Sequence, residues 1–302
     1  WFLSTSETGF YPEKFRDFYF GNHLEYDPYY WDYYYGYDDG NYYGSRTEVK
    51  QNGSGELDEN GKLALGLKIE NPKFPTPQQL HLLTEVTDGR DQTLTSNARL
   101  TIHPSSHYLG LGRIDSLLRV NQANKIRLVA VDNKGNHSDA AFDIKVTIER
   151  ISYESVKVRS GDGKVTINNK EVKGLFATLD LTIPAGKETV IPFTPDLPGR
   201  YTITVESKDA EGNRMTTATR YRVYGAEEYP WAVETGMKIQ LAPEQKHYKP
   251  GDTARILVMT PIEGTALVTV ERSGVLRHYR RELKSSDPVI EIPIEHNDAP
   301  NM

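Results

Sequence analysis

The fold is decided by residues 247–276, which read HYKPGDTARILVMTPIEGTALVTVERSGVL. Two runs within it, 254–259 and 266–271, are rich in the aliphatic and β-branched residues that favour strands. Turn residues bound both runs, at Pro250-Gly251-Asp252, Ile262-Glu263-Gly264 and Ser273-Gly274. The stretch therefore predicts an antiparallel meander, in which each strand turns back beside the last.

The same pattern of strand-forming runs bounded by turn residues continues through the rest of the chain. Apolar residues alternate with polar or small ones over 63–69, 142–148, 201–205 and 290–294, which indicates strands with one buried face. Three turns share the form D-x-x-G, beginning at Asp58, Asp132 and Asp209. In such a turn the aspartate caps the backbone and the glycine takes the left-handed conformation that closes a hairpin. With no convincing amphipathic helix, the pattern predicts an all-β chain of antiparallel β-sandwiches in series.

Breaks in the pattern predict three domains. A chain of 302 residues is long enough for two or three cores. His103-Pro104-Ser105-Ser106 and the segment 224–230 interrupt the strands, so the predicted domains are 1–104, 105–225 and 226–302. The middle domain is longer than a plain sandwich requires, and its excess lies between Arg159 and Ala185.

Composition and motifs exclude several classes of function. A net charge of −6 without a basic cluster argues against nucleic-acid binding. The absence of cysteine excludes disulfides, zinc–thiolate sites and a cysteine nucleophile from this chain. His103 and His107 have the spacing of helical metal ligands, but Pro104 favours a linker. No phosphate loop, nucleophile elbow or apolar run of ~20 residues is present, so we expect neither an enzyme nor a cofactor or metal site.

The C-terminal third resembles the bacterial alpha-2-macroglobulin family. The resemblance is carried by Y-x-P-G-D-T-A-x-x-L-V at Tyr248–Val258, then by Gly264–Arg272 and Pro293–Asn301. Weaker similarity runs from Pro198–Ile203 to Trp231, and again over Leu100–Gly112. It covers roughly residues 55–302.

The resemblance implies a fold and a function. Members of that family are chains of macroglobulin-like, fibronectin-III-like sandwiches that trap proteases. A protease cuts an exposed bait segment, the molecule collapses around it, and in most members a Cys-x-x-Gln thioester then bonds to the attacker. This chain has no cysteine, so any thioester lies outside it. We therefore expect a segment of a non-enzymatic protease inhibitor, lacking the first strand of domain 1–104 and truncated within domain 226–302.

The resemblance also implies partners and a location. The expected partners are proteases of a host or a competitor, together with a penicillin-binding protein in envelope repair. The expected location is the bacterial periplasm or cell envelope, with a lipid anchor outside this segment.

The bait is predicted in the irregular excess at 159–185, where the family carries it. A bait requires exposed, weakly structured backbone and side chains that proteases accept. The candidates for trypsin-like enzymes are Arg159, Lys164, Lys170 and Lys173, and those for chymotrypsin-like enzymes are Leu175 and Phe176. The alternative is a long hairpin in which 164–167 pairs with 176–179.

Residues 26–43, YDPYYWDYYYGYDDGNYY, hold nine tyrosines, one tryptophan and four aspartates. Three interpretations stay open: an insertion covering a sandwich edge, a contact surface formed by Tyr30, Trp31, Tyr33 and Tyr35, or disorder. The contact surface leads to a rival function, an adhesin or carbohydrate-binding array. A second rival is a non-catalytic accessory module of a glycosidase or peptidase.

Overall fold

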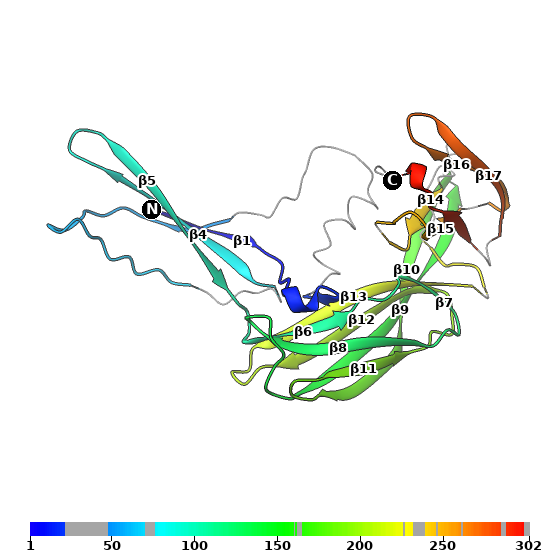
Figure 1. Cartoon of the computed structure of the whole chain (residues 1–302), viewed down its shortest axis with the longest axis horizontal. Coiled ribbons are helices and arrows are strands. Elements are labelled where there is room, and N and C mark those ends of the chain that lie inside the picture. The colour runs from blue at the N-terminus through cyan, green and yellow to red at the C-terminus, as the bar shows by residue number, and fades with distance from the viewer. Residues whose placement is uncertain are drawn as a thin grey trace.

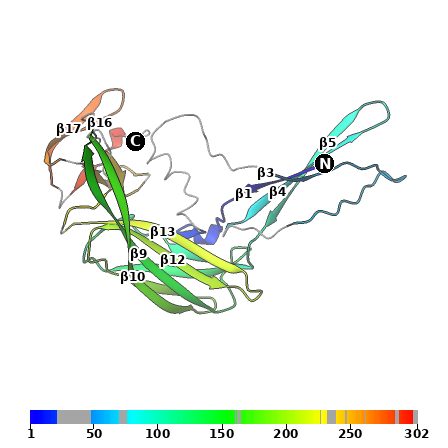
Figure 2. The same cartoon turned by 180° about the vertical axis from the view of Figure 1, so that it is seen from behind.

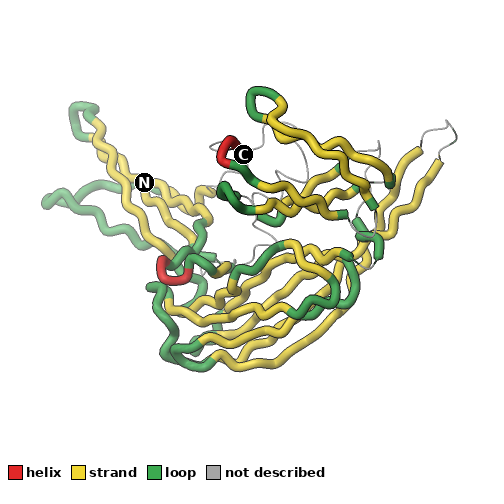
Figure 3. The backbone as a smooth tube through the Cα atoms, turned by 45° about the vertical axis from the view of Figure 1, so that its right-hand side comes forward, coloured by secondary structure: helices red, strands yellow, loops and turns green. Residues whose placement is uncertain are grey.

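The structure is a computed structural model that describes residues 1–21, 48–69, 76–159, 161, 165–225, 227–231, 239–245, 247–260, 262–284 and 288–298. Over these residues the regular structure is β-strand, apart from two short 3-10 helices, η1 (Glu13–Phe15) and η2 (His296–Asp298). The sheets form an N-terminal sheet that projects from one end of a middle sandwich, and a C-terminal sandwich that lies above its other end (Figures 1 and 3). The predicted all-β, antiparallel fold class is confirmed.

The middle sandwich consists of two sheets. The first has the order β11-β8-β6-β2, with bounds Glu188–Phe193, Asn124–Asp132, His107–Gly112 and Phe18–Phe20. The second has the order β10-β9-β12-β13-β7, with bounds Val165–Ile183, Phe142–Arg159, Gly199–Lys208, Arg214–Tyr224 and Leu117–Arg119. All neighbours pair antiparallel except β13 and β7, which are parallel.

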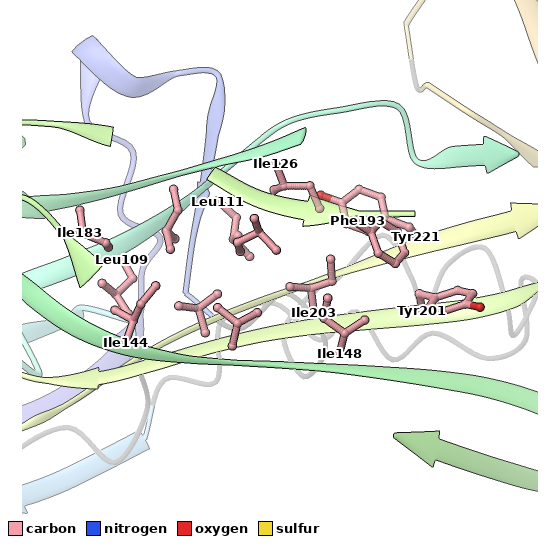
Figure 4. Packing of buried hydrophobic residues seen from close by; sticks show 14 of the residues in the cluster. Leu109, Leu111, Ile126, Ile144, Ile148, Ile183, Phe193, Tyr201, Ile203 and Tyr221 are labelled. Atoms are coloured by element: carbon pink, nitrogen blue, oxygen red, sulfur yellow. The ribbon is translucent and has the colours of Figure 1, made fainter. Parts of the chain in front are cut away.

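The core of the middle sandwich follows directly from the alternation in its strands. Ile144, Val146 and Ile148 of β9 are buried, as are Tyr201, Ile203 and Val205 of β12, and these side chains meet those of the facing sheet (Figure 4). Tyr201 is fully buried, yet its hydroxyl donates to the carbonyl of Leu197 at 3.0 Å, so this buried polar atom has a hydrogen-bond partner. Leucine, isoleucine and aromatic residues from both sheets thus make one continuous core.

A segment near the N-terminus completes this sandwich. Strand β2 pairs with β6, and Phe15, Phe18 and Phe20 pack with Tyr108 in a second buried cluster. A Cβ added to Gly110 would lie 2.6 Å from the ring of Phe20, so glycine leaves the space that this ring occupies. Residues 18–20 therefore belong to the middle sandwich in space, although they lie in the predicted domain 1–104. The three domain boundaries stay predictions.

The N-terminal sheet has the order β3-β1-β4-β5, with bounds Glu48–Asn52, Phe2–Glu7, Gln78–Thr87 and Thr93–Ile102. The strand predicted over residues 63–69 is wrong, because that segment forms no strand and pairs with none of the strands that the structure describes. Leu63 and Ile69 are 41% and 45% exposed, so the alternation there has no sheet to bury it.

In the C-terminal sandwich the two predicted strands do not pair with each other, so the predicted meander is wrong. Strand β15 (Thr253–Met259) pairs with β14 (Gln240–Pro243) and β18 (Val289–Pro293). Among the described strands, β16 (Gly264–Glu271) pairs with β17 (Val275–Leu283) alone. The two runs are strands, as predicted, but the turn between them moves the chain to the facing sheet. There the hydroxyl of Thr260 donates to the carbonyl of Ile262 and accepts from its N–H, which stabilises the corner.

The three D-x-x-G turns form as predicted. In each, a carboxylate oxygen of the aspartate accepts at least one backbone N–H within the turn, at 2.7–2.9 Å. Gly61, Gly135 and Gly212 have φ of 71°, 80° and 83°, the left-handed region that the turn requires.

Candidate functional site

The predicted bait segment lies on an extension of the middle sandwich. Strands β9 and β10 pair along their length, from Phe142 opposite Ile183 to Val165 opposite Arg159. Strand β12 pairs with β9 only as far as Ile151. Beyond it, residues 152–159 and 165–172 form a two-stranded ribbon, which we call the extension (Figure 2). A two-stranded ribbon by itself is only marginally stable in water, so its base decides its order.

The hairpin predicted as the alternative to a bait is wrong, because the two segments expected to pair are not partners. Residues 165–167 and 176–179 lie on the same strand, β10, and cannot pair with each other. Their partners are at opposite ends of β9: residues 157–159 pair with the first group, and 146–148 with 177–179. Residues 165–183 are therefore one regular strand, although the composition of this part of the chain indicates irregular structure.

A hydrogen-bonded brace closes the base of the extension. The Tyr153 hydroxyl donates to Glu171 Oε2 at 2.7 Å, across the two strands. Arg200 of β12 reaches the same pair, donating from Nη2 to the Tyr153 hydroxyl at 2.7 Å and to Glu171 Oε2 at 3.2 Å. Arg200 thus links the ribbon to β12 of the five-stranded sheet.

The charge of Glu171 is stabilised by these contacts. Burial alone would raise the pKa of the Glu171 carboxyl. The hydrogen bonds from Tyr153 and Lys173, with the charge of Arg200, outweigh burial and hold that pKa below its ordinary value. Glu171 therefore stays ionised and keeps its partners at neutral pH.

The predicted basic cleavage positions are exposed, and two of them form surface ion pairs. Arg159 ends β9 with its side chain in solvent, and Lys170 and Lys173 are exposed on β10. Lys170 Nζ lies 3.9 Å from Glu154, and Lys173 Nζ lies 3.2 Å from Glu171. These are surface ion pairs, which stabilise little and do not hinder access. Lys164 lies outside the described residues.

The two apolar candidates differ sharply although they are adjacent. Leu175 is 69% exposed, whereas Phe176 is half-buried and packs edge-on against Tyr201 and Phe193, with ring centroids 5.3 Å and 5.9 Å apart. The ladder of β10 shifts register between Leu175 and Ala177, and this bulge turns Phe176 toward the core. Cleavage at Phe176 would require its ring to leave the core, so Leu175 is the better presented of the two.

Backbone pairing limits protease access to the extension. A protease binds its substrate as an extended strand and needs several residues of free backbone. Strand β10 is already extended and lies at the edge of its sheet, where none of the described strands pairs with its outer side. Its other side is bonded to β9 throughout 165–175, so a cut there requires local opening of the ribbon. The candidate cleavage residues stay predictions.

Two other groups of residues singled out in the sequence are the aromatic side chains of the possible contact surface and a pair of histidines. Tyr30, Trp31, Tyr33 and Tyr35 lie outside the described residues. His103 and His107 serve local contacts: His103 Nδ1 lies 2.8 Å from the Tyr108 hydroxyl, and His107 Nδ1 lies 3.0 Å from the Ser106 hydroxyl. Within the described ranges, no group of three His, Asp or Glu side chains could hold a metal ion, and no helix is long and apolar enough to cross a membrane.

Sequence reasoning missed the brace and a second polar contact. Tyr153, Glu171 and Arg200 are 18 and 47 residues apart along the chain, so no local motif unites them. The second contact joins Asp115 of the middle sandwich to Arg255 of the C-terminal sandwich at 2.9 Å. Its only sequence signal is an arginine within the aliphatic run 254–259.

Comparisons with known proteins agree with the family resemblance. Residues 239–302 match the family model described as the alpha-2-macroglobulin bait region domain. The chain is 22% identical over 256 residues to an alpha-2-macroglobulin homolog of Nostoc sp., covering 84% of this chain and 13% of that protein. It is 24% identical over 221 residues to a homolog of Yersinia pestis, covering 71% of this chain and 11% of that protein.

A solved structure is similar along most of the chain. The native conformation of Escherichia coli alpha-2-macroglobulin aligns with a TM-score of 0.46 at 15% identity, over 97% of this chain and 18% of that one. The family match and the curated relatives confirm the resemblance inferred from the sequence, and the chain spans about an eighth of the length of those relatives. The predicted bait segment at 159–185 lies outside the matched residues 239–302.

Proposed function

We propose that this chain, with its confirmed resemblance to bacterial alpha-2-macroglobulins, is a segment of a protease-trapping inhibitor. In this proposal a protease cuts an exposed bait segment, and the longer protein collapses around the attacker. The observation that carries the proposal is the match of residues 239–302 to the bait region domain. The chain acts as a scaffold and a trigger, and takes no chemical step in the reaction.

The trigger has two candidate positions. Exposure of Arg159, Lys170 and Lys173 on an edge ribbon supports the extension. The family match supports a bond within 239–302 or close to it. Because the extension must open before it is cut, we expect cleavage there to be slower than at an unpaired segment.

The test of the proposal is cleavage followed by compaction. The full-length protein is treated with trypsin at a low ratio, the first cut is mapped by mass spectrometry, and the radius of gyration is followed by X-ray scattering. We expect a single early cut followed by a smaller radius of gyration. Early cuts scattered over the chain, or no compaction after the first cut, would contradict a trap.

A matched variant locates the trigger. Replacing Lys157, Arg159, Lys164, Lys170 and Lys173 together by glutamine removes every trypsin site between residues 152 and 173. If the first cut and the compaction are then lost, the bait lies in the extension. If both persist, the bait follows the family match instead, and the trap proposal stands with a different trigger.

The finer expectations of partner and location stay predictions. The periplasm, the lipid anchor and a penicillin-binding protein are supported only by the resemblance. The rival adhesin function rests on Tyr30, Trp31, Tyr33 and Tyr35, and its test is loss of glycan binding in Tyr33→Ala or Tyr35→Ala.

A further inference from the structure

The joint between the middle and C-terminal sandwiches has an apolar part. Tyr224 of β13 and Leu117 of β7 pack with Tyr229 and Trp231 of the connecting segment. From the C-terminal sandwich, Ala242, Leu257 and Met259 complete the cluster. Apolar contact stabilises the joint but is non-directional, so it does not by itself fix one rotational setting of the two bodies.

Strand β15 lies between two cores, and this explains its unbroken apolar run. Leu257 and Met259 face the joint, whereas Ala254 and Val258 face the interior of the C-terminal sandwich. A strand with one wet face would alternate, but β15 is covered on both faces. Arg255 is the charged exception within this strand, and it stands at the rim of the joint with 30% of its side chain exposed.

The guanidinium of Arg255 connects the two sandwiches. Its Nε lies 2.5 Å from Glu244 Oε2 within the C-terminal sandwich, and its Nη2 donates to Asp115 Oδ2 of the middle sandwich at 2.9 Å. The Glu244 carboxylate is nearly buried, with 6% of its side chain exposed. The rigid planar fork of arginine can serve two carboxylates in fixed directions, which a flexible ammonium cannot do as well.

A second hydrogen bond crosses the joint beside the first. The Ser116 hydroxyl donates to the carbonyl of Glu244 at 2.5 Å. Ser116 is itself held to the sheet of the middle sandwich, because its carbonyl accepts from the N–H of Arg222 at 2.8 Å. The acceptor carboxylate of Asp115 and the donor of Ser116 thus sit on anchored backbone, and both point at the segment 244–255.

We propose that Arg255, oriented by Glu244 and bonded to Asp115, is a rotational lock that makes the middle and C-terminal sandwiches move as one rigid body. The lock adds little stability, since Asp115 is half-exposed and such pairs contribute weakly. Its role is to select one setting among those that the apolar cluster tolerates. One consequence rests on the proposed function: displacement of the bait region domain after cleavage would carry the middle sandwich with it.

The chain is suited to a direct measurement, because it contains no cysteine and labels can be placed at will. Lys187 and Thr269 are exposed, one on each sandwich, and both are replaced by cysteine and spin-labelled. Pulsed dipolar spectroscopy then reports the distribution of distances between the two bodies. We expect one narrow peak in the otherwise unchanged chain.

Three variants test whether the contact between Arg255 and Asp115 fixes the setting of the two sandwiches. Arg255→Gln and Asp115→Asn should each replace the narrow peak by a broad distribution, and the double variant should be no broader than either. The control Arg280→Gln, which removes an exposed arginine of the same sandwich, should keep the narrow peak. Circular dichroism at near-ultraviolet wavelengths verifies that each variant is folded.

Two outcomes would overturn the lock. A narrow peak in both Arg255→Gln and Asp115→Asn shows that the apolar cluster and the Ser116–Glu244 hydrogen bond fix the setting without the arginine. Broadening in Arg255→Gln without broadening in Asp115→Asn shows that the arginine acts only within its own sandwich. If Arg255→Gln does not fold, Asp115→Asn carries the test, because it alters only a half-exposed side chain.

Discussion

Arg200 Nη2 donates to the hydroxyl of Tyr153 at 2.7 Å, and this bond ties the two-stranded extension to the rest of its sheet. Arg200 is 11% exposed in its side chain, whereas the strands that it braces are largely in solvent. The extension is therefore a marginal element fastened at one end.

Loss of this brace should loosen the extension. We expect Arg200→Met to speed trypsin cleavage after Lys170 or Lys173 about threefold to tenfold, which corresponds to about 0.7–1.4 kcal/mol of local opening free energy. The rate is measured by mass spectrometry of native digests. The control Arg214→Met removes an exposed arginine of the neighbouring strand β13 and should leave that rate unchanged. Equal rates in both variants would show that the brace does not control opening.

Phe176 should matter far more than its neighbour. Phe176→Ala removes a ring that packs on Tyr201 and Phe193, and we expect it to lower the free energy of unfolding by about 2 kcal/mol, below the range for a fully buried ring. Leu175→Ala, at a position 69% exposed, should change it by less than about 0.5 kcal/mol. Urea unfolding of the two variants measures the difference. A Leu175→Ala effect as large as that of Phe176→Ala would mean that the bulge directs the wrong side chain inward.

Asp209 should make part of the stability dependent on acid. Burial alone would raise its pKa, but hydrogen bonds from Ser106 and Asn213 outweigh burial and hold the pKa below its ordinary value of 3.8. Because the unfolded state then binds the proton more readily, the carboxylate stabilises the fold above about pH 4, and this contribution is lost as the pH falls through the folded-state pKa. We expect Asp209→Asn to cost about 1–2 kcal/mol at pH 7 and less at pH 3.

Urea midpoints at the two pH values test this expectation. The gap between the unmodified chain and Asp209→Asn should narrow at pH 3. Asp58→Asn, in the matching turn of an exposed loop, should show a small gap at both pH values. An Asp209→Asn gap that is the same at pH 3 and pH 7 would contradict the assigned role of the carboxylate.

The sequence carried most of the strands and turns, because their signals are local. Alternation located β9, β12 and β18, and the D-x-x-G form located three turns. Which strands pair with each other was harder to predict from the sequence. No feature of residues 254–271 indicates that β15 and β16 belong to different sheets. The alternation over 63–69 predicted a strand that does not form, because a strand also requires a neighbouring strand to pair with.

The candidate site was harder to foresee for the same reason. Arg159, Lys170 and Lys173 could be chosen by side-chain chemistry and position alone. The brace at Arg200 and the lock at Arg255 depend on residues 47 and 140 positions away, which only the folded chain brings together. Contacts of this kind decide how a cleavable segment is presented, and periodicity does not report them.

The central claim, a protease trap, is tested most directly by the size of substrate that a bound protease can still cut. The full-length protein is incubated with trypsin, and hydrolysis of a small peptide substrate is compared with hydrolysis of a large protein substrate. A trap encloses the protease without blocking its active site, so small-substrate activity should persist while large-substrate activity is lost. Loss of both activities, or of neither, would contradict the trap.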